Sequence, residues 1–81
     1  MKKAMLNKLL ELGYTKYQTD MYVKDVIVLQ IYGSKIYSKH VNVCVLAKSI
    51  EDIDELESRL DFFREQVKIM NKDLEELRKY E

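Results

Sequence analysis

The residues of this sequence that can do chemistry are few, and they do not form a recognisable catalytic site. The one histidine, His40, has no carboxylate within two positions, and no serine or cysteine stands in a nucleophile motif. His40, Asn42 and Cys44 share a face of one expected strand, but positions four apart on a strand lie about 13 Å from each other, too far to share one ion. Gly13 and Gly33 are isolated, so there is no phosphate-binding loop. We expect no enzyme, no metal site and no cofactor.

Tyrosines and lysines on the expected strands indicate a different kind of site, a surface for single-stranded nucleic acid. Aromatic rings stack on bases while ammonium groups contact phosphates. Four residues share one face in the expected register, namely Tyr22, Lys24, Tyr32 and His40. Tyrosine is also a good strand former, and a formal net charge of zero argues against a general nucleic-acid binder. Nucleic-acid binding is therefore kept as an alternative.

A run of acidic residues in the last third of the chain raises a second alternative. Its members include Glu51, Asp54, Glu55, Asp61 and Glu65. Carboxylates along a helix can imitate a DNA backbone and so inhibit a DNA-binding protein, although such a run is more often a solvated helix face. The charge is uneven along the chain. Residues 1 to 48 carry eight lysines and three acids, a balance of +5, and residues 49 to 81 carry six basic and eleven acidic residues, a balance of −5.

Length and composition bound the class of protein. Eighty-one residues suffice for one domain, residues 1 to 81, with a small core. Cys44 is the only cysteine, which suits a reducing compartment. The basic start lacks an unbroken apolar stretch, and nothing approaches the ~20 apolar residues that span a bilayer, so we expect a cytoplasmic protein that does not bind membranes. Eleven lysines against three arginines are typical of AT-rich genomes, including those of phages and other mobile elements.

The elements expected to position these residues are two helices with strands between them. An apolar stripe predicts a helix over residues 2–12 that ends at Gly13 in a left-handed cap. Strands are expected at about 21–32 and 36–47, and residues 14–18 alternate well enough for a third. A helix over about 50–80 follows, with Ser49 as its N-cap candidate. The fold class is therefore α+β, with a short N-terminal helix, an antiparallel hairpin or three-stranded meander, and a long C-terminal helix.

The burial pattern predicts the register of the hairpin. A loop of three residues pairs positions whose numbers sum to 68, and it places one apolar set on the inner face: Val23, Ile27, Leu29, Ile31, Tyr37, Val41, Val43 and Val45. A two-residue loop would divide that set between the faces. Asp25 and Lys39 do not fit the inner face. They are expected to mark a sheet margin, a bulge, or a turn at Lys24-Asp25 that divides the first strand.

The most regular pattern is a coiled-coil repeat in the C-terminal helix. Apolar residues fill every a and d position of four heptads, a set we call the seam: Ile53, Leu56, Leu60, Phe63, Val67, Met70, Leu74 and Leu77. A helix of roughly 31 residues spans about 46 Å, longer than an eleven-residue strand at about 36 Å, so it should project beyond its sheet. We expect the seam to be a partner interface, most simply that of a homodimer.

Charges beside the seam favour an antiparallel homodimer. In a parallel pair, Arg59 at position g would meet the partner's Arg64 at position e. An antiparallel pair centred near Val67 would instead create two attractive contacts, Glu57 with the partner's Arg78 and Arg59 with the partner's Asp73. The predicted function is therefore a small non-enzymatic protein-binding, adaptor or inhibitor protein whose further partner the sequence does not identify.

Two residues at c positions widen the apolar stripe in its middle. Phe62 and Ile69 are expected to pack on the chain's own hairpin or first helix, which would leave the a and d positions for the neighbour. The competing interpretation is that the whole stripe packs within one chain.

Overall fold

The computed structural model describes residues 1–43 and 53–81. Its elements are α1 (Lys3–Glu11), β1 (Thr15–Gln18), β2 (Met21–Lys24), β3 (Ile27–Tyr32), β4 (Lys35–Val41), α2 (Ile53–Leu77) and the 3₁₀ turn η2 (Arg78–Tyr80). The strands form one antiparallel sheet in the order β1-β2-β3-β4. The α+β class is confirmed. Predictions that concerned Cys44, Val45, Ser49, Ile50 and Glu51 lie outside the described residues.

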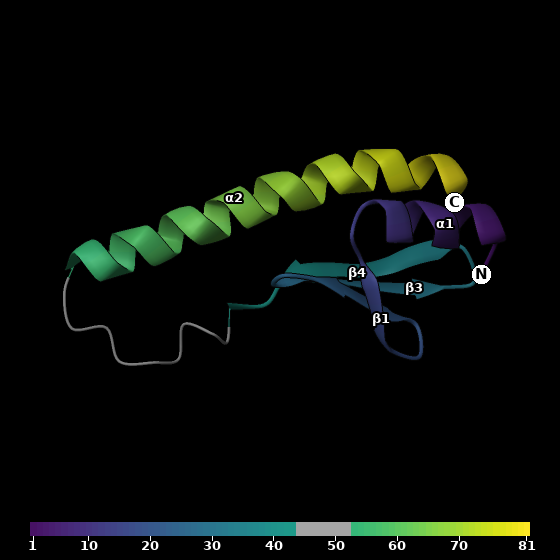
Figure 1. Cartoon of the computed structure of the whole chain (residues 1–81), viewed down its shortest axis with the longest axis horizontal. Coiled ribbons are helices and arrows are strands. Elements are labelled where there is room, and N and C mark those ends of the chain that lie inside the picture. The colour runs from purple at the N-terminus through teal and green to yellow at the C-terminus, as the bar shows by residue number, and fades with distance from the viewer. Residues whose placement is uncertain (44–52) are drawn as a thin grey trace.

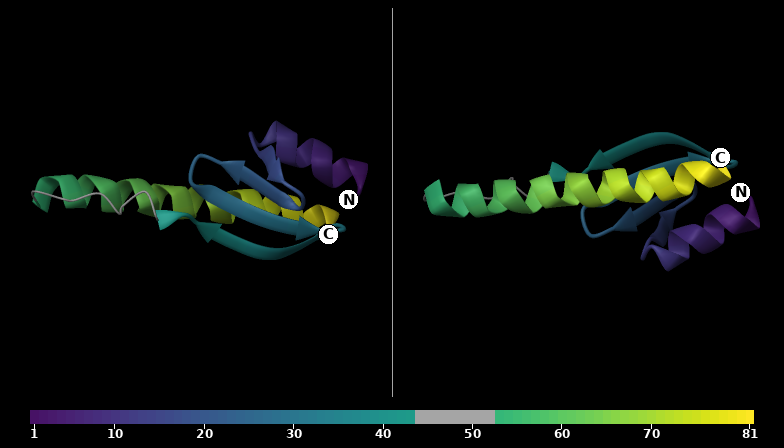
Figure 2. Two further views of the ribbon diagram at one scale, coloured as in Figure 1. Left: turned by 90° about the horizontal axis from the view of Figure 1, so that it is seen from below. Right: turned by 90° about the horizontal axis from the view of Figure 1, so that it is seen from above.

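The two helices lie on the same face of the sheet. Figure 1 shows α2 above the strands with its N-terminal part extending well past the sheet, and Figure 2 shows α1 beside the C-terminal part of α2. The core lies between these layers and combines residues of both helices with β2 and β3: Met5, Leu9, Tyr14, Tyr22, Ile27, Leu29, Ile31, Met70, Leu74 and Leu77. The opposite face of the sheet is not covered by any element that the structure describes.

Helix α1 ends in the left-handed cap that the sequence predicts. Gly13 has a φ of 98°. Its amide donates to the carbonyl of Leu10, and the amide of Tyr14 donates to the carbonyl of Leu9. This pair of bonds is the Schellman arrangement, which satisfies carbonyls that the end of a helix leaves free. It also turns the chain so that Tyr14, 1% exposed, enters the core.

The segment expected as one strand over 21–32 is two strands joined by a tight turn. Lys24 pairs with Ile27, so Asp25 and Val26 form the turn, and Asp25 has a φ of 52°. Aspartate adopts this left-handed conformation more readily than most residues. Of the three outcomes expected for Asp25, the structure shows the turn. The sheet consequently has four strands rather than two or three, because β1 also forms.

The turn at Asp25 changes which residues of β2 face the core. Facing residues of paired strands lie on the same side of a sheet, and Tyr22 pairs with Leu29. Tyr22 therefore points to the core and is 5% exposed, whereas Val23, expected on the inner face, lies on the outer one. A shift of one position moves a whole strand from one face to the other.

The β3–β4 pairing follows the predicted register along most of its length. Positions that sum to 68 pair from Gln30 with Ser38 to Ile27 with Val41. Beyond an irregularity between Gln30 and Ile31, the sum becomes 67 and the loop is Gly33-Ser34, with two residues rather than three. Lys39 pairs with Leu29 but remains exposed, because β4 is the edge strand.

Candidate interaction surface

Helix α2 divides into a docked segment and a projecting segment. All of its buried residues lie in the docked segment, residues 63–77, and none lies in the projecting segment, residues 53–62. Seam residues of the docked segment enter the core, with Leu77 at 0% exposed and Leu74 at 3%. Ile53 at the far end is 65% exposed. Residues 1–43 and 53–81 therefore do not cover the whole seam.

Three seam residues form a line of exposed apolar side chains that we call the exposed stripe: Ile53, Leu60 and Val67. They are 65%, 37% and 40% exposed, respectively. At about 100° of rotation per residue, these three positions lie within about 40° of one another around the helix axis. Leu56, between them, is half-buried. An apolar line of this kind on a projecting helix is a candidate protein-binding surface.

The seam leaves the sheet because its repeat does not match the helix. A heptad repeat drifts by about 20° per heptad on a straight helix, so the three heptads from Leu74 back to Ile53 amount to about 60°. Seam residues near the C-terminus of α2 thus face the sheet, whereas seam residues nearer its N-terminus lie on the flank of the helix. Met70, Leu74 and Leu77 are in the chain's own core, which differs from the expectation that a and d positions would be left for a neighbour.

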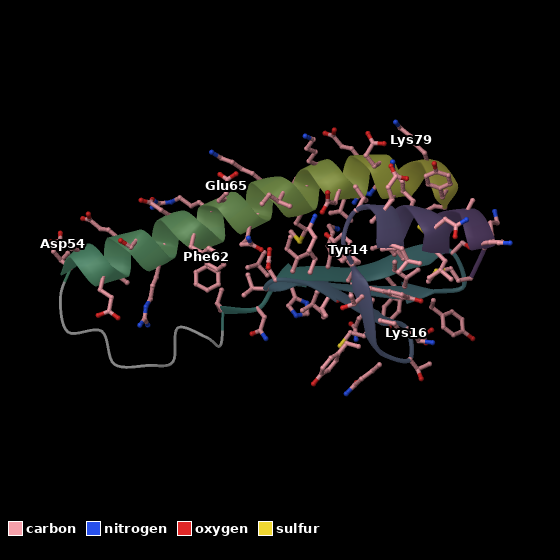
Figure 3. The ribbon with its side chains drawn as sticks, viewed as in Figure 1. Tyr14, Lys16, Asp54, Phe62, Glu65 and Lys79 are labelled. Atoms are coloured by element: carbon pink, nitrogen blue, oxygen red, sulfur yellow. The ribbon has the colours of Figure 1, made fainter. Side chains whose placement is uncertain are left out.

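The c positions expected to pack on the chain's own sheet behave differently from each other. Ile69 is partly buried against the core. Phe62 is 45% exposed and makes an edge-to-face contact with Phe63, with ring centroids 5.4 Å apart. Figure 3 shows Phe62 pointing from the projecting segment to the side on which the sheet lies. Phe62 is two residues from Leu60, about 160° away around the helix axis, so it lies apart from the exposed stripe.

A buried polar cluster anchors the docked segment to the sheet. The Lys24 ammonium donates to Asp73 Oδ2 at 2.6 Å and to the Leu12 carbonyl at 3.0 Å. The Tyr14 hydroxyl donates to the same Asp73 oxygen at 2.8 Å, and Lys24 Nζ lies 5.0 Å from the centroid of the Tyr14 ring. Tyr14 occupies the space between α2 and the strands in Figure 3. These contacts join the end of α1, β2 and α2, three parts of the chain that are distant in sequence.

The cluster is satisfied in charge and in hydrogen bonds. Asp73 is 5% exposed, and a carboxylate so deeply buried is stable only when it is paired. Burial, helped by the hydrogen bond to Asp73, raises the pKa of Tyr14 well above its ordinary value of 10.0. Tyr14 is therefore a neutral donor at physiological pH. The arrangement is a structural clamp that holds the docked segment of α2 against the sheet.

The sequence pattern did not indicate this cluster, although it contains one signal. Once the chain turns at Asp25, Lys24 joins Tyr22 on the core side of β2. A lysine on the core side needs a buried carboxylate, and Asp73 lies one position before Leu74 on the sheet-facing side of α2. The missing information was the turn, since a continuous strand places Lys24 on the outer face.

The cluster also corrects one contact predicted for the antiparallel pair. Asp73 is bound by Lys24 and Tyr14 in its own chain, so it is not available to the partner's Arg59. Arg59 itself pairs with Glu55 one turn earlier. An antiparallel pair centred near Val67 would therefore lack the predicted contact between Arg59 and the partner's Asp73.

The structure does not bring the four residues of the nucleic-acid hypothesis to one face. Tyr22 and Lys24 point to the core side, and Lys24 is held by Asp73. Tyr32, 73% exposed, and His40 lie on the opposite side. His40 pairs with Val28, and Val28 and Tyr32 are four residues apart on β3, so their side chains point to the same side of the sheet. The physical reason is again the turn at Asp25, which shifts β2 by one position relative to β3.

Of the described residues of the acidic alternative, three lie on the solvent side of the projecting segment and just beyond it, whereas Glu55 is half-buried and lies about 100° from Asp54 around the helix axis. Asp54, Asp61 and Glu65 are exposed, and Figure 3 shows Asp54 and Glu65 on the side of α2 away from the sheet. Glu55 pairs with Arg59, and Asp61 pairs with Arg64 at 2.8 Å. Lysines at 68 and 72 continue the same side of the helix. Its surface is therefore mixed in charge, with two of its acids partly neutralised.

The uncovered face of the sheet carries an open hollow of about 420 Å³. Met21, Val23, Val28 and Tyr17 supply apolar lining, and Asp25 and His40 are among its polar members. In the part of the chain that the structure describes, no three His, Cys, Asp or Glu side chains gather as metal ligands would. Within residues 1–43 and 53–81, neither helix combines the length and the apolar character that a membrane span requires.

Comparison with known proteins adds no assignment. No family model, no curated protein and no solved structure matches this chain.

Proposed function

We propose that this protein is a non-enzymatic protein-binding domain that self-associates through the exposed stripe of α2. The observation that carries the proposal is the exposed stripe of Ile53, Leu60 and Val67 on a helix that extends past its own sheet. Apolar side chains aligned on an isolated helix lose free energy when a second helix covers them. Homodimerisation is the simplest way to supply that helix.

The rest of the fold supports this role. The Tyr14–Lys24–Asp73 cluster and the core hold the docked segment on the sheet, and the projecting segment continues the same α-helix. A preorganised helix binds with a smaller loss of conformational entropy than one that must fold on binding. The proposal includes a cytoplasmic location, because a single cysteine suits a reducing compartment. Adaptor or inhibitor activity toward another protein would use the same dimer.

The experiment measures the mass of the particle in solution. We expect wild-type protein to elute as a dimer in chromatography with light scattering, and Leu60→Asp to elute as a folded monomer with unchanged helix content by circular dichroism. Leu10→Asp is the matched control, because Leu10 is an equally large residue, 56% exposed, on α1 rather than on α2. A wild-type monomer at every concentration tested, or a Leu60→Asp dimer as tight as the wild type, would refute the proposal.

A further inference from the structure

We infer that the occupant of the exposed stripe is the same stripe of a second copy, running antiparallel, with the two-fold axis at Leu60. The inference rests on the proposed function and adds the identity, direction and register of the partner helix. It depends on the spacing of the exposed stripe and on two charged residues beside it, Glu57 and Arg64.

The exposed stripe is self-complementary when the second helix runs in the opposite direction. Ile53 and Val67 each lie seven residues from Leu60, on either side of it. An antiparallel copy centred at Leu60 therefore places Leu60 against the partner's Leu60 and Ile53 against the partner's Val67. The Leu60–Leu60 contact lies on the axis, and the Ile53–Val67 contact occurs twice, as a two-fold interface requires. The most exposed apolar residue of the stripe, Ile53, is covered at both ends of the pair.

Charges at the border of the stripe select the same arrangement. Glu57 and Arg64 are exposed and lie within about 60° of Leu60 around the helix axis. They stand three positions before and four positions after Leu60, so the antiparallel copy brings Glu57 beside the partner's Arg64, again twice. A parallel copy would bring Arg59 toward the partner's Arg64 and oppose two positive charges. The two contacts between Glu57 and the partner's Arg64 thus favour the antiparallel copy.

Neither charged residue is committed to a buried contact in the single chain. Arg64 pairs with Asp61, but both side chains are at least 70% exposed, and exposed pairs of this type stabilise a helix only slightly. Glu57 forms no ion pair with any residue that the structure describes. Contacts of Glu57 and Arg64 with a partner helix would therefore sacrifice little stability of the single chain.

The position of the sheet permits the antiparallel pair. The sheet covers the docked segment, and the stripe lies on the flank of α2 rather than on the side that faces the strands. With the axis at Leu60, the partner's Val67 lies against Ile53, and the rest of the partner's docked segment continues past the N-terminal end of this chain's α2. The two sheets are then at opposite ends of the helix pair and do not compete for space.

Charge reversal tests the direction and register. In sedimentation equilibrium, Arg64→Glu and Glu57→Arg should each raise the dimer dissociation constant about tenfold, since each change makes two attractive contacts repulsive. The double variant Glu57→Arg/Arg64→Glu should return to within about threefold of wild type. Matched charge reversals on the solvent side of α2, Glu65→Lys and Lys72→Glu, should leave the constant unchanged.

The outcomes separate this inference from the proposed function. A wild-type dimer that Arg64→Glu tightens would show the parallel pair, in which Arg59 and the partner's Arg64 repel each other. A dimer that is indifferent to all these reversals would place the contact elsewhere on the chain. Either result overturns the inference while self-association stands. A wild-type monomer overturns both.

Discussion

The docked and projecting segments of α2 carry the same heptad repeat and have opposite surroundings. Leu74 sits in the core at 3% exposed, while Ile53, at the same a position of the heptad, is 65% exposed. The difference between them is the sheet, which ends before the helix does. A repeat of apolar residues therefore indicates that something covers this side of the helix. It does not indicate whether that cover belongs to the same chain.

The largest expected loss of stability comes from shortening a side chain in the docked segment. Leu77→Ala removes a fully buried side chain between α2 and the sheet, and the loss of apolar burial together with the cavity left behind should reduce the free energy of unfolding by about 2–5 kcal/mol. That is a large part of the total stability expected of a small domain. Urea denaturation followed by circular dichroism measures the change. A loss below about 1 kcal/mol would mean that the docked segment is held no more firmly than the projecting one.

A second test addresses the clamp beneath the docked segment. Tyr14→Phe deletes the hydroxyl that donates to Asp73, and the loss of one buried bond to a charged acceptor should cost about 1–2 kcal/mol. Tyr17→Phe, on a tyrosine that is 66% exposed, is the matched control and should cost almost nothing.

The same variant predicts a difference in alkaline solution. Because the pKa of Tyr14 is raised in the folded protein, only the unfolded state loses this proton just above pH 10.0. The contribution of Tyr14 to stability is therefore complete below that pH and falls as the pH rises further, by at most about 1.4 kcal/mol per pH unit. Denaturation curves between pH 9 and 11 should show this extra decline in wild type and not in Tyr14→Phe. Equal slopes in both proteins would mean that the hydroxyl is not held in the buried cluster.

Local patterns in the sequence were sufficient for several parts of the fold. Gly13 was predicted as a left-handed cap because the apolar stripe of α1 stops there, and the long helix was predicted to outreach its strands from length alone. The register of β3 with β4 followed from the alternation around Ile27 and Leu29. In each case the decisive residues are close together in the chain or belong to one hairpin.

The parts that sequence reasoning missed depend on residues far apart. Asp25 lies inside an apolar run that reads as one strand, and the position of the turn decides whether Lys24 faces the core or the solvent. The observed turn places Lys24 on the core side, where it contacts Asp73, 49 residues away in the sequence. No local propensity encodes that distance, and a one-position shift was enough to divide the expected nucleic-acid face between two sides of the sheet.

The smallest expected change in the free energy of unfolding is in the projecting segment, and it distinguishes the two segments of α2 most directly. Ile53→Ala shortens a side chain that is 65% exposed, so in a single chain the free energy of unfolding should change by no more than about 0.5 kcal/mol, mostly through side-chain area and helix propensity. If the exposed stripe is an interface, the unfolding temperature of the wild type should rise with protein concentration, since dimerisation stabilises the folded state by mass action. The unfolding temperature of Ile53→Ala should not depend on concentration. Melting curves over a range of concentrations, compared with Leu10→Ala as the control, measure both effects. A cost at Ile53 as large as that at Leu77, without any dependence on concentration, would mean that the projecting segment is covered by its own chain and that the two halves of α2 do not differ.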